Sequence, residues 1–263
     1  AGEATGELIL SGSTDKPVLS GDISLKRTKL KIDYLNVTYS LADQIHFKEN
    51  LIYFDNIIVY DSVANEAVAS GKVQHNYFKD FVLDLDFTTK KIIGLNTSRQ
   101  QNEIFYGSAL ASGSFKISGP PDNLKMDINV KSEKGTSIKI PASYGSEVAN
   151  NEFIVYLKHD EQANDVVRDY EVNLKGLSLK LGLNITHDAN IQLFLPYQMG
   201  NIQATGNGDL FMNIDPSGNF TMEGQYIIDK GSFFLTLQNI INRDFNIRRG
   251  SHIVWSGDPY NAQ

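Results

Sequence analysis

The chain has 263 residues, and its 24 basic and 31 acidic side chains give a formal net charge of −7. It contains no cysteine, which excludes a disulfide scaffold, thiolate metal sites and cysteine nucleophiles. The acidic excess argues against broad binding to nucleic acid, and no apolar stretch is long enough to cross a membrane as a helix.

The strongest pattern is an alternation of apolar and polar residues, which is typical of strands with one apolar and one polar face. In chain order it occurs at 23–25, 30–32, 45–47, 81–87, 115–117, 124–130, 138–140, 177–185, 210–214 and 220–228. Turn residues separate these segments, and helical periodicity is nearly absent. The most polar stretch, residues 158–169, is predicted to be a solvated loop. The sequence therefore predicts an all-β protein, which we take as one domain over residues 1–263.

A coarse internal repeat suggests how these strands are organised. Strand segments beginning at Gly6, Gly113 and Gly208 are each followed by a proline and a second strand, and the starts lie about a hundred residues apart. This spacing indicates an elongated antiparallel assembly. The apolar faces could close on one another as a β-sandwich, or a single sheet could curl into a trough. A trough would suit an acyl chain, because each buried methylene contributes about 0.8 kcal/mol.

Residues for catalysis or metal binding are missing from the expected spacings. None of the five histidines has a partner at metal-ligand spacing: His46, His75, His159, His187 and His252. Asp84 and Asp86 form a carboxylate pair, but they occupy the polar side of an alternating strand. No nucleophile elbow and no phosphate-binding glycine loop is present. We expect no metal, no cofactor and no enzymatic activity.

The carboxy-terminal residues carry a family resemblance. They read Phe220-x-Met222-x-Gly224-x-Tyr226, then Gly231-Ser-Phe233, and end on the set Gly250, Trp255, Gly257, Asp258 and Pro259. This order resembles the carboxy-terminal domain of the TamB family of translocation and assembly modules (AsmA-like superfamily), most closely its Bacteroidetes-type members. Further matching segments lie at 17–21, 34–39, 52–56, 78–81, 106–113 and 133–141. The resemblance extends over essentially the whole chain.

The resemblance implies a fold and a location. The fold would be an elongated, curled, antiparallel-rich sheet, called a β-taco or half-pipe, with an apolar groove. The protein would lie in the periplasm of a Gram-negative bacterium, as the outer-membrane end of a chain anchored in the inner membrane. Its partners would be phospholipid and an outer-membrane barrel of the Omp85 or TamA type. Because the family continues past the Asp-Pro motif, we expect the chain to be a piece of a longer protein that lacks terminal strands.

Two functions remain open under this resemblance. The first is a lipid conduit that carries phospholipid acyl chains along the groove between the inner and outer membranes. The second is a non-lipid scaffold that assists outer-membrane protein assembly or secretion by strand addition. A surface adhesin built as a β-solenoid is a weaker third, because no short coil repeat is present. The predicted groove lining is Leu25, Ile32, Phe54, Leu83, Leu85, Phe115, Ile117, Met126, Ile128, Leu179, Leu181, Leu193, Leu210, Met212, Phe220, Met222, Phe233 and Leu235.

Overall fold

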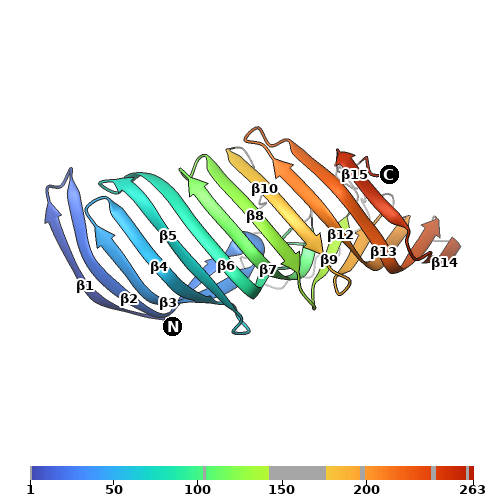
Figure 1. Ribbon diagram of the computed structural model, residues 1–263, viewed down its shortest axis with the longest axis horizontal. Helices are drawn as coiled ribbons and strands as arrows, with labels where there is room; N and C mark the ends of the chain where they lie inside the picture. The colour runs from blue at the N-terminus through green and yellow to red at the C-terminus, as the bar shows by residue number, and fades with distance from the viewer. Residues whose placement is uncertain (1, 103–104, 142–175, 196–198, 238–240, 259–260) are drawn as a thin grey trace, which may run out of the picture.

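A computed structural model describes residues 2–102, 105–141, 176–195, 199–237, 241–258 and 261–263. These residues form one continuous fifteen-stranded sheet, which Figure 1 shows with its strands side by side from β1 at one end to β15 near the other. The only helical element among them is a 3₁₀ turn, η1 (Asp33–Leu35). The strands are β1 (Glu3–Gly12), β2 (Pro17–Ile32), β3 (Val37–Lys48), β4 (Leu51–Tyr60), β5 (Glu66–Asn76), β6 (Lys79–Thr97), β7 (Tyr106–Gly119), β8 (Leu124–Ser132), β9 (Ser137–Pro141), β10 (Leu177–Ile185), β11 (Asn190–Phe194), β12 (Gly200–Ile214), β13 (Phe220–Leu237), β14 (Ile241–Ile247) and β15 (His252–Gly257).

The all-β prediction is confirmed, and so is the elongated, antiparallel-rich sheet. Neighbouring strands pair antiparallel except for β8 with β10 and β9 with β11, which are parallel. One curled sheet replaces the alternative of two separate sheets packed as a sandwich. The polar loop predicted at 158–169 lies outside the described residues.

A crease, marked by bulges and short turns, runs across the sheet. Strand registers shift there in β2, β3, β4, β6 and between β12 and β13, as expected where a bulge bends a strand. Short turns mark the crease between β8 and β9, between β10 and β11 and between β14 and β15, whereas β5 and β7 cross it without an extra residue. We define the crease as Arg27, Asp43, Asn56, 90–91, 133–136, 186–189, Asp229 and 248–251. It divides the sheet into a first arm, which holds β1, β8, β10 and β15, and a second arm, which holds β9, β11 and β14; the other strands run through both.

Apolar side chains from both arms meet at the crease, so this side of the sheet is called the inner face. One cluster contains Ile57, Val59, Ala67, Ala69 and Ile92, with Phe54 and Phe87 packed against it. A second contains Ile185, Ala189, Ala204, Leu210, Tyr226 and Ile228. No large side chain in the described part of the chain is fully buried. The core is therefore two local clusters along a curled sheet.

Near the amino-terminal end the second arm closes partly on itself. Strands β3 and β6 extend past the short β4–β5 turn and approach each other. The Tyr39 hydroxyl donates to the carbonyl oxygen of Ile93 at 2.7 Å, and the Asn36 side-chain amide donates to the Asn96 carbonyl oxygen at 2.7 Å. Asp61, in the turn, accepts from the Ile93 N–H at 2.9 Å. These bonds give this end its partly barrel-like curvature.

Candidate functional site

The inner face is the candidate site, because it gathers apolar side chains from strand to strand. In the first arm, Ile117 pairs with Leu85 on one side and Met126 on the other, and Met126 pairs with Leu179. Pairing partners put their side chains on the same side of a sheet, so these residues form a row across four strands. A parallel row continues through Leu181, Met212 and Met222. By the same registers, all eighteen residues predicted to line the groove lie on the inner face.

The exposure of these eighteen residues differs from that of an ordinary core. Only Leu210 is buried, while Ile32 and Phe220 are 37% and 38% exposed. The remainder are half-buried. Side chains packed between two closed layers would be covered almost completely, whereas these keep contact with the surroundings. That they line a lipid groove stays a prediction.

Several inner-face residues escape the alternation. Val59, Ala67, Ala69 and Ile92 are buried at the crease, although no alternating segment of the sequence includes them. The small residues of β7 also lie on this face: Gly107, Ala109, Ala111 and Gly113. Left-handed residues mark the crease in the structure, among them Arg27 at φ 54° and Asn56 at φ 53°, and this backbone is uncommon for residues other than glycine. The alternation of apolar and polar residues in the sequence does not reveal where such a bend lies.

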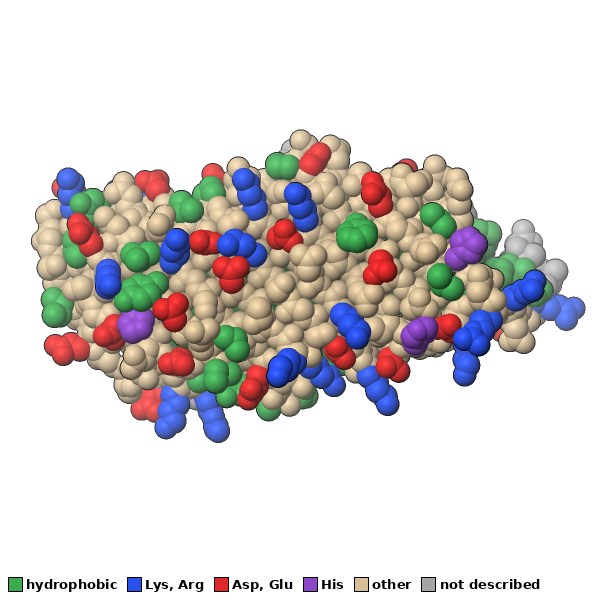
Figure 2. All heavy atoms as spheres, in the orientation of Figure 1, with side chains coloured by type: hydrophobic (Ala, Val, Ile, Leu, Met, Phe, Trp, Pro, Cys, Tyr) green, Lys and Arg blue, Asp and Glu red, His purple; other side chains and the backbone are tan. Residues whose placement is uncertain are grey.

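The opposite, outer face is polar. Figure 2 shows a face on which charged side chains of both signs are scattered among small hydrophobic patches. Asp84 lies 3.0 Å from Lys116 and 3.6 Å from Lys72, and Asp86 lies 3.4 Å from Lys116. The hydrogen bond and charge of Lys116 lower the pKa of Asp84. The carboxylate pair is therefore held in exposed ion pairs on the solvated side of the sheet.

The histidines have separate surroundings. His46 lies 2.6 Å from Asp22 on the outer face, and His187 contacts Asp229 at the crease. His75 is buried and stacks on Phe78, and burial lowers its pKa. His159 lies outside the described residues. Among the residues that the structure describes, no group of three or more histidine or acidic side chains could hold a metal ion.

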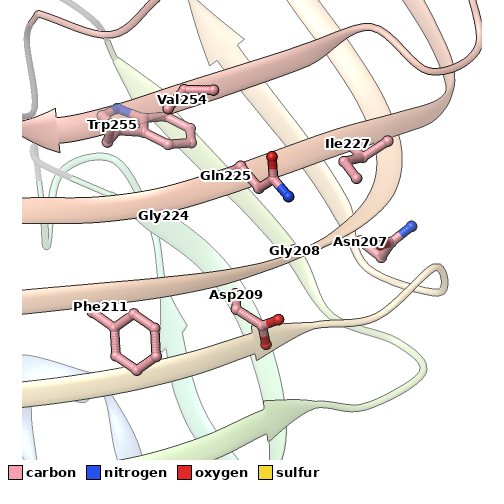
Figure 3. Close-up of a pocket in the computed structure, with 9 residues that line it drawn as sticks. All are labelled: Asn207, Gly208, Asp209, Phe211, Gly224, Gln225, Ile227, Val254 and Trp255. Carbon is pink, nitrogen blue, oxygen red and sulfur yellow. The ribbon is translucent and has the colours of Figure 1, made fainter.

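A depression of about 430 Å³ lies at the carboxy-terminal end of the sheet (Figure 3). Phe211 on its edge is 62% exposed, and Asp209 and Gln225 supply polar groups beside it. Phe211 pairs with Gly182 of β10, and its ring approaches that glycine, which has no side chain of its own. The lining mixes polar and apolar groups and does not coincide with the predicted groove.

The carboxy-terminal motif forms the end of the sheet. Trp255 pairs with Gly224 and packs against the second core cluster, so its indole lies beside a position that has no side chain. Gly250 has φ 86° in the turn before β15, and Gly257 has φ 138° at the end of that strand. Asp258 accepts a hydrogen bond from the Asn261 N–H at 3.1 Å through its carbonyl oxygen. Pro259 lies outside the described residues.

Comparison with known proteins gives one match. A model of the TamB C-terminal domain matches residues 55–263, and it begins within β4. No curated protein and no solved structure matches the chain. Strands β1–β3 precede the match but belong to the same sheet. No helix in the described ranges is long and apolar enough to cross a membrane. The chain belongs to the TamB C-terminal domain family of the Gram-negative envelope, and this membership supports a role in translocation and assembly at the outer membrane.

Proposed function

We propose that this domain is a non-catalytic conduit that carries phospholipid acyl chains along its inner face, between the two membranes of the envelope. The observation that supports the proposal is a pair of adjoining rows of half-exposed apolar side chains, one across β6, β7, β8 and β10 and one across β10, β12 and β13. Head groups would travel at the rims of the two arms, where the turns are polar. The periplasm is the proposed location, with an outer-membrane barrel of the TamA type as partner.

The energetics of such a surface suit transport. Each methylene removed from water contributes about 0.8 kcal/mol, whether a bilayer or a protein surface covers it. Transfer from a bilayer to the inner face is therefore close to neutral, and the chain can leave again. Met126, Met212 and Met222 lie in adjoining inner rows, and their flexible side chains adapt to a moving chain. The two rows across β6, β7, β8 and β10 and across β10, β12 and β13 contain no charged residue, so they give a sliding chain no deep trap.

Charged substitutions on the inner face test this proposal. Leu83→Asp, Met126→Asp and Met222→Asp each place a carboxylate among half-exposed side chains, where the fold can tolerate it. In the intact protein in cells, lipid transfer to the outer membrane should fall while protein levels stay normal. Lys125→Asp, one residue from Met126 but on the outer face, is the matched control. Normal transfer in all three inner-face variants would overturn the conduit.

A second candidate is a scaffold that adds strands to an assembling barrel or docks on the barrel partner by strand pairing. The observation that favours it is the presence of open edges at both ends of the sheet. β1 is exposed along its whole length, and β14 pairs only with β13 among the described strands. The edge of β15 is covered at Val254, whose N–H and carbonyl oxygen both bond Gln263. Proline substitutions along β14 should then abolish barrel binding without changing lipid transfer, and unchanged binding would exclude this edge.

A further inference from the structure

The inner face is not filled evenly along its length. The first core cluster involves residues of β3 to β6, and the second involves residues of β10 to β15. No residue of β7, β8 or β9 belongs to either cluster, and the apolar residues of these three strands are all partly exposed. The centre of the inner face is therefore its least packed stretch among the described residues.

The residues of β7 on this face are unusually small. Gly107, Ala109, Ala111 and Gly113 occupy successive inner positions, from the rim of the second arm to the crease. Seven residues of strand cover about 20 Å. Beyond Gly113 the stripe ends at Phe115, whose ring stacks on Phe87 with centroids 4.4 Å apart and planes 5° apart. The stripe is a shallow strip of backbone and methyl groups, bounded by a flat aromatic pair.

A buried hydroxyl at the rim end of this stripe gives an independent indication of a ligand. Thr97 pairs directly with Gly107, so its side chain leaves the sheet on the inner face beside a position without a side chain. Thr97 is only 6% exposed, and its Oγ1 has no hydrogen-bond partner. A buried hydroxyl without a partner loses free energy, and a ligand oxygen placed there would recover it.

We infer that one acyl chain of a phospholipid has a preferred seat along Gly107, Ala109, Ala111 and Gly113. The chain lies over the small residues between rim and crease and ends against the Phe87–Phe115 pair. Its ester carbonyl, at the rim, accepts a hydrogen bond from the Thr97 hydroxyl. This inference rests on the proposed conduit and deepens it, because it names one place on the inner face where the lipid pauses.

Photolabelling tests the seat. The probe is a phosphatidylethanolamine with a diazirine on one acyl chain, supplied in vesicles to the intact protein, and labelled peptides are mapped by mass spectrometry. Peptides from β6 to β9 should carry several times more label than those from β12 and β13. Ala111→Trp fills the seat and should lower this central labelling about tenfold. Ser114→Trp, on the outer face of the same strand, should leave it unchanged.

Two further variants keep the test decisive. Ala109→Leu is a milder obstruction for use if circular dichroism shows that Ala111→Trp misfolds, and it should lower central labelling in the same direction. Thr97→Val should reduce labelling by the phospholipid but not by a diazirine alkane, which has no ester. If Thr97→Val reduces labelling by the two probes equally, or reduces neither, the hydroxyl has no part in the seat. Even labelling of all strands, unaffected by filling the seat, would overturn the seat and leave the conduit standing. Absence of inner-face labelling altogether would overturn both.

Discussion

Replacing Asp61 by alanine should loosen the partly closed amino-terminal end of the sheet. Asp61 is only 6% exposed, yet its carboxylate accepts four hydrogen bonds. The donors are the Val63 N–H at 3.0 Å, the Asn65 N–H at 2.9 Å, the Asn65 side-chain amide at 2.8 Å and the Ile93 N–H at 2.9 Å. The last of these ties the β4–β5 turn to β6.

The size of the stability loss in Asp61→Ala depends on which of the four donors can be hydrated once the carboxylate is gone. In Asp61→Ala the turn donors can be hydrated, but the Ile93 N–H of β6 is left without its carboxylate. A hydrogen bond to a charged group contributes roughly 1.5–3 kcal/mol, and an unpaired buried donor costs about as much as the upper end of that range. We therefore expect a loss of roughly 3 kcal/mol at this end of the sheet. Amide exchange of β6 should then accelerate about a hundredfold, because each 1.4 kcal/mol is tenfold.

The chain supplies a matched control at the β12–β13 turn. Asp215 accepts from the Ser217 N–H and from both the N–H and the side-chain amide of Asn219, in the same sequence spacing as Asp61. Within the described part of the chain, its carboxylate makes no hydrogen bond to a neighbouring strand. Hydrogen exchange measured by mass spectrometry should show a much smaller effect for Asp215→Ala. Equal effects of the two substitutions, or no acceleration in β6 for Asp61→Ala, would refute the reasoning.

The same substitution has a pH signature. Burial raises the pKa of Asp61, but its hydrogen bonds from Asn65, Ile93 and Val63 outweigh burial and lower it below the ordinary value. A lowered folded-state pKa contributes stability that is complete above the unfolded value of about 3.9 and is lost as the pH falls through the lower folded value. The difference between wild type and Asp61→Ala should therefore shrink only in that acidic window. Burial and the charge of Asp61 also raise the pKa of Tyr39 to about 12, and that pKa should fall in the variant.

Two other predictions concern the carboxy-terminal end. Gly224 has φ 121°, and a Cβ there would lie 2.1 Å from the Asp209 carbonyl oxygen, so Gly224→Ala should clearly lower the urea midpoint of unfolding. Gly218 has open space around it, so Gly218→Ala should lower the midpoint less. Equal shifts in the two variants would contradict the steric argument. The hydrogen bond and charge of His187 lower the pKa of Asp229. In His187→Gln the pKa of Asp229 should therefore rise towards its ordinary value, as measured by NMR of the carboxyl carbon. An unchanged titration of Asp229 would rule out the contact.

The first arm could be predicted from the sequence because alternation there is uninterrupted. In 124–130 the apolar residues are all even-numbered and in 177–185 they are all odd-numbered, and the structure contains both segments as strands. In the second arm the alternation predicted only short pieces such as 30–32 and 138–140, because the crease changes whether odd-numbered or even-numbered residues face inward. Inner residues of β13 are even-numbered up to Ile228 and odd-numbered from Gly231, since Asp229 is an extra residue opposite the junction of Thr205 and Gly206. Where the inward-facing residues switch from even to odd numbers, the alternation in the sequence breaks, and the break looks the same as the end of a strand.

Pairing between distant segments was also beyond sequence reasoning. The parallel register of β8 with β10 depends on where the sheet places two segments that are far apart in the chain. The bond from Tyr39 to Ile93 likewise depends on β3 and β6 meeting beyond a shorter hairpin. For the predicted lining residues that lie within alternating segments, such as Met126, the side of the sheet did follow from alternation, because a strand of period two has only two sides.

The central claim is that acyl chains travel on the inner face. Its most direct test is a photo-crosslinking amino acid placed at Met126 and, in a separate variant, at the adjacent Lys125 of the intact protein in cells. If acyl chains travel on the inner face, the crosslinker at Met126 captures phospholipid and the crosslinker at Lys125 does not. Equal capture at the two positions, or capture at Lys125 alone, would contradict it.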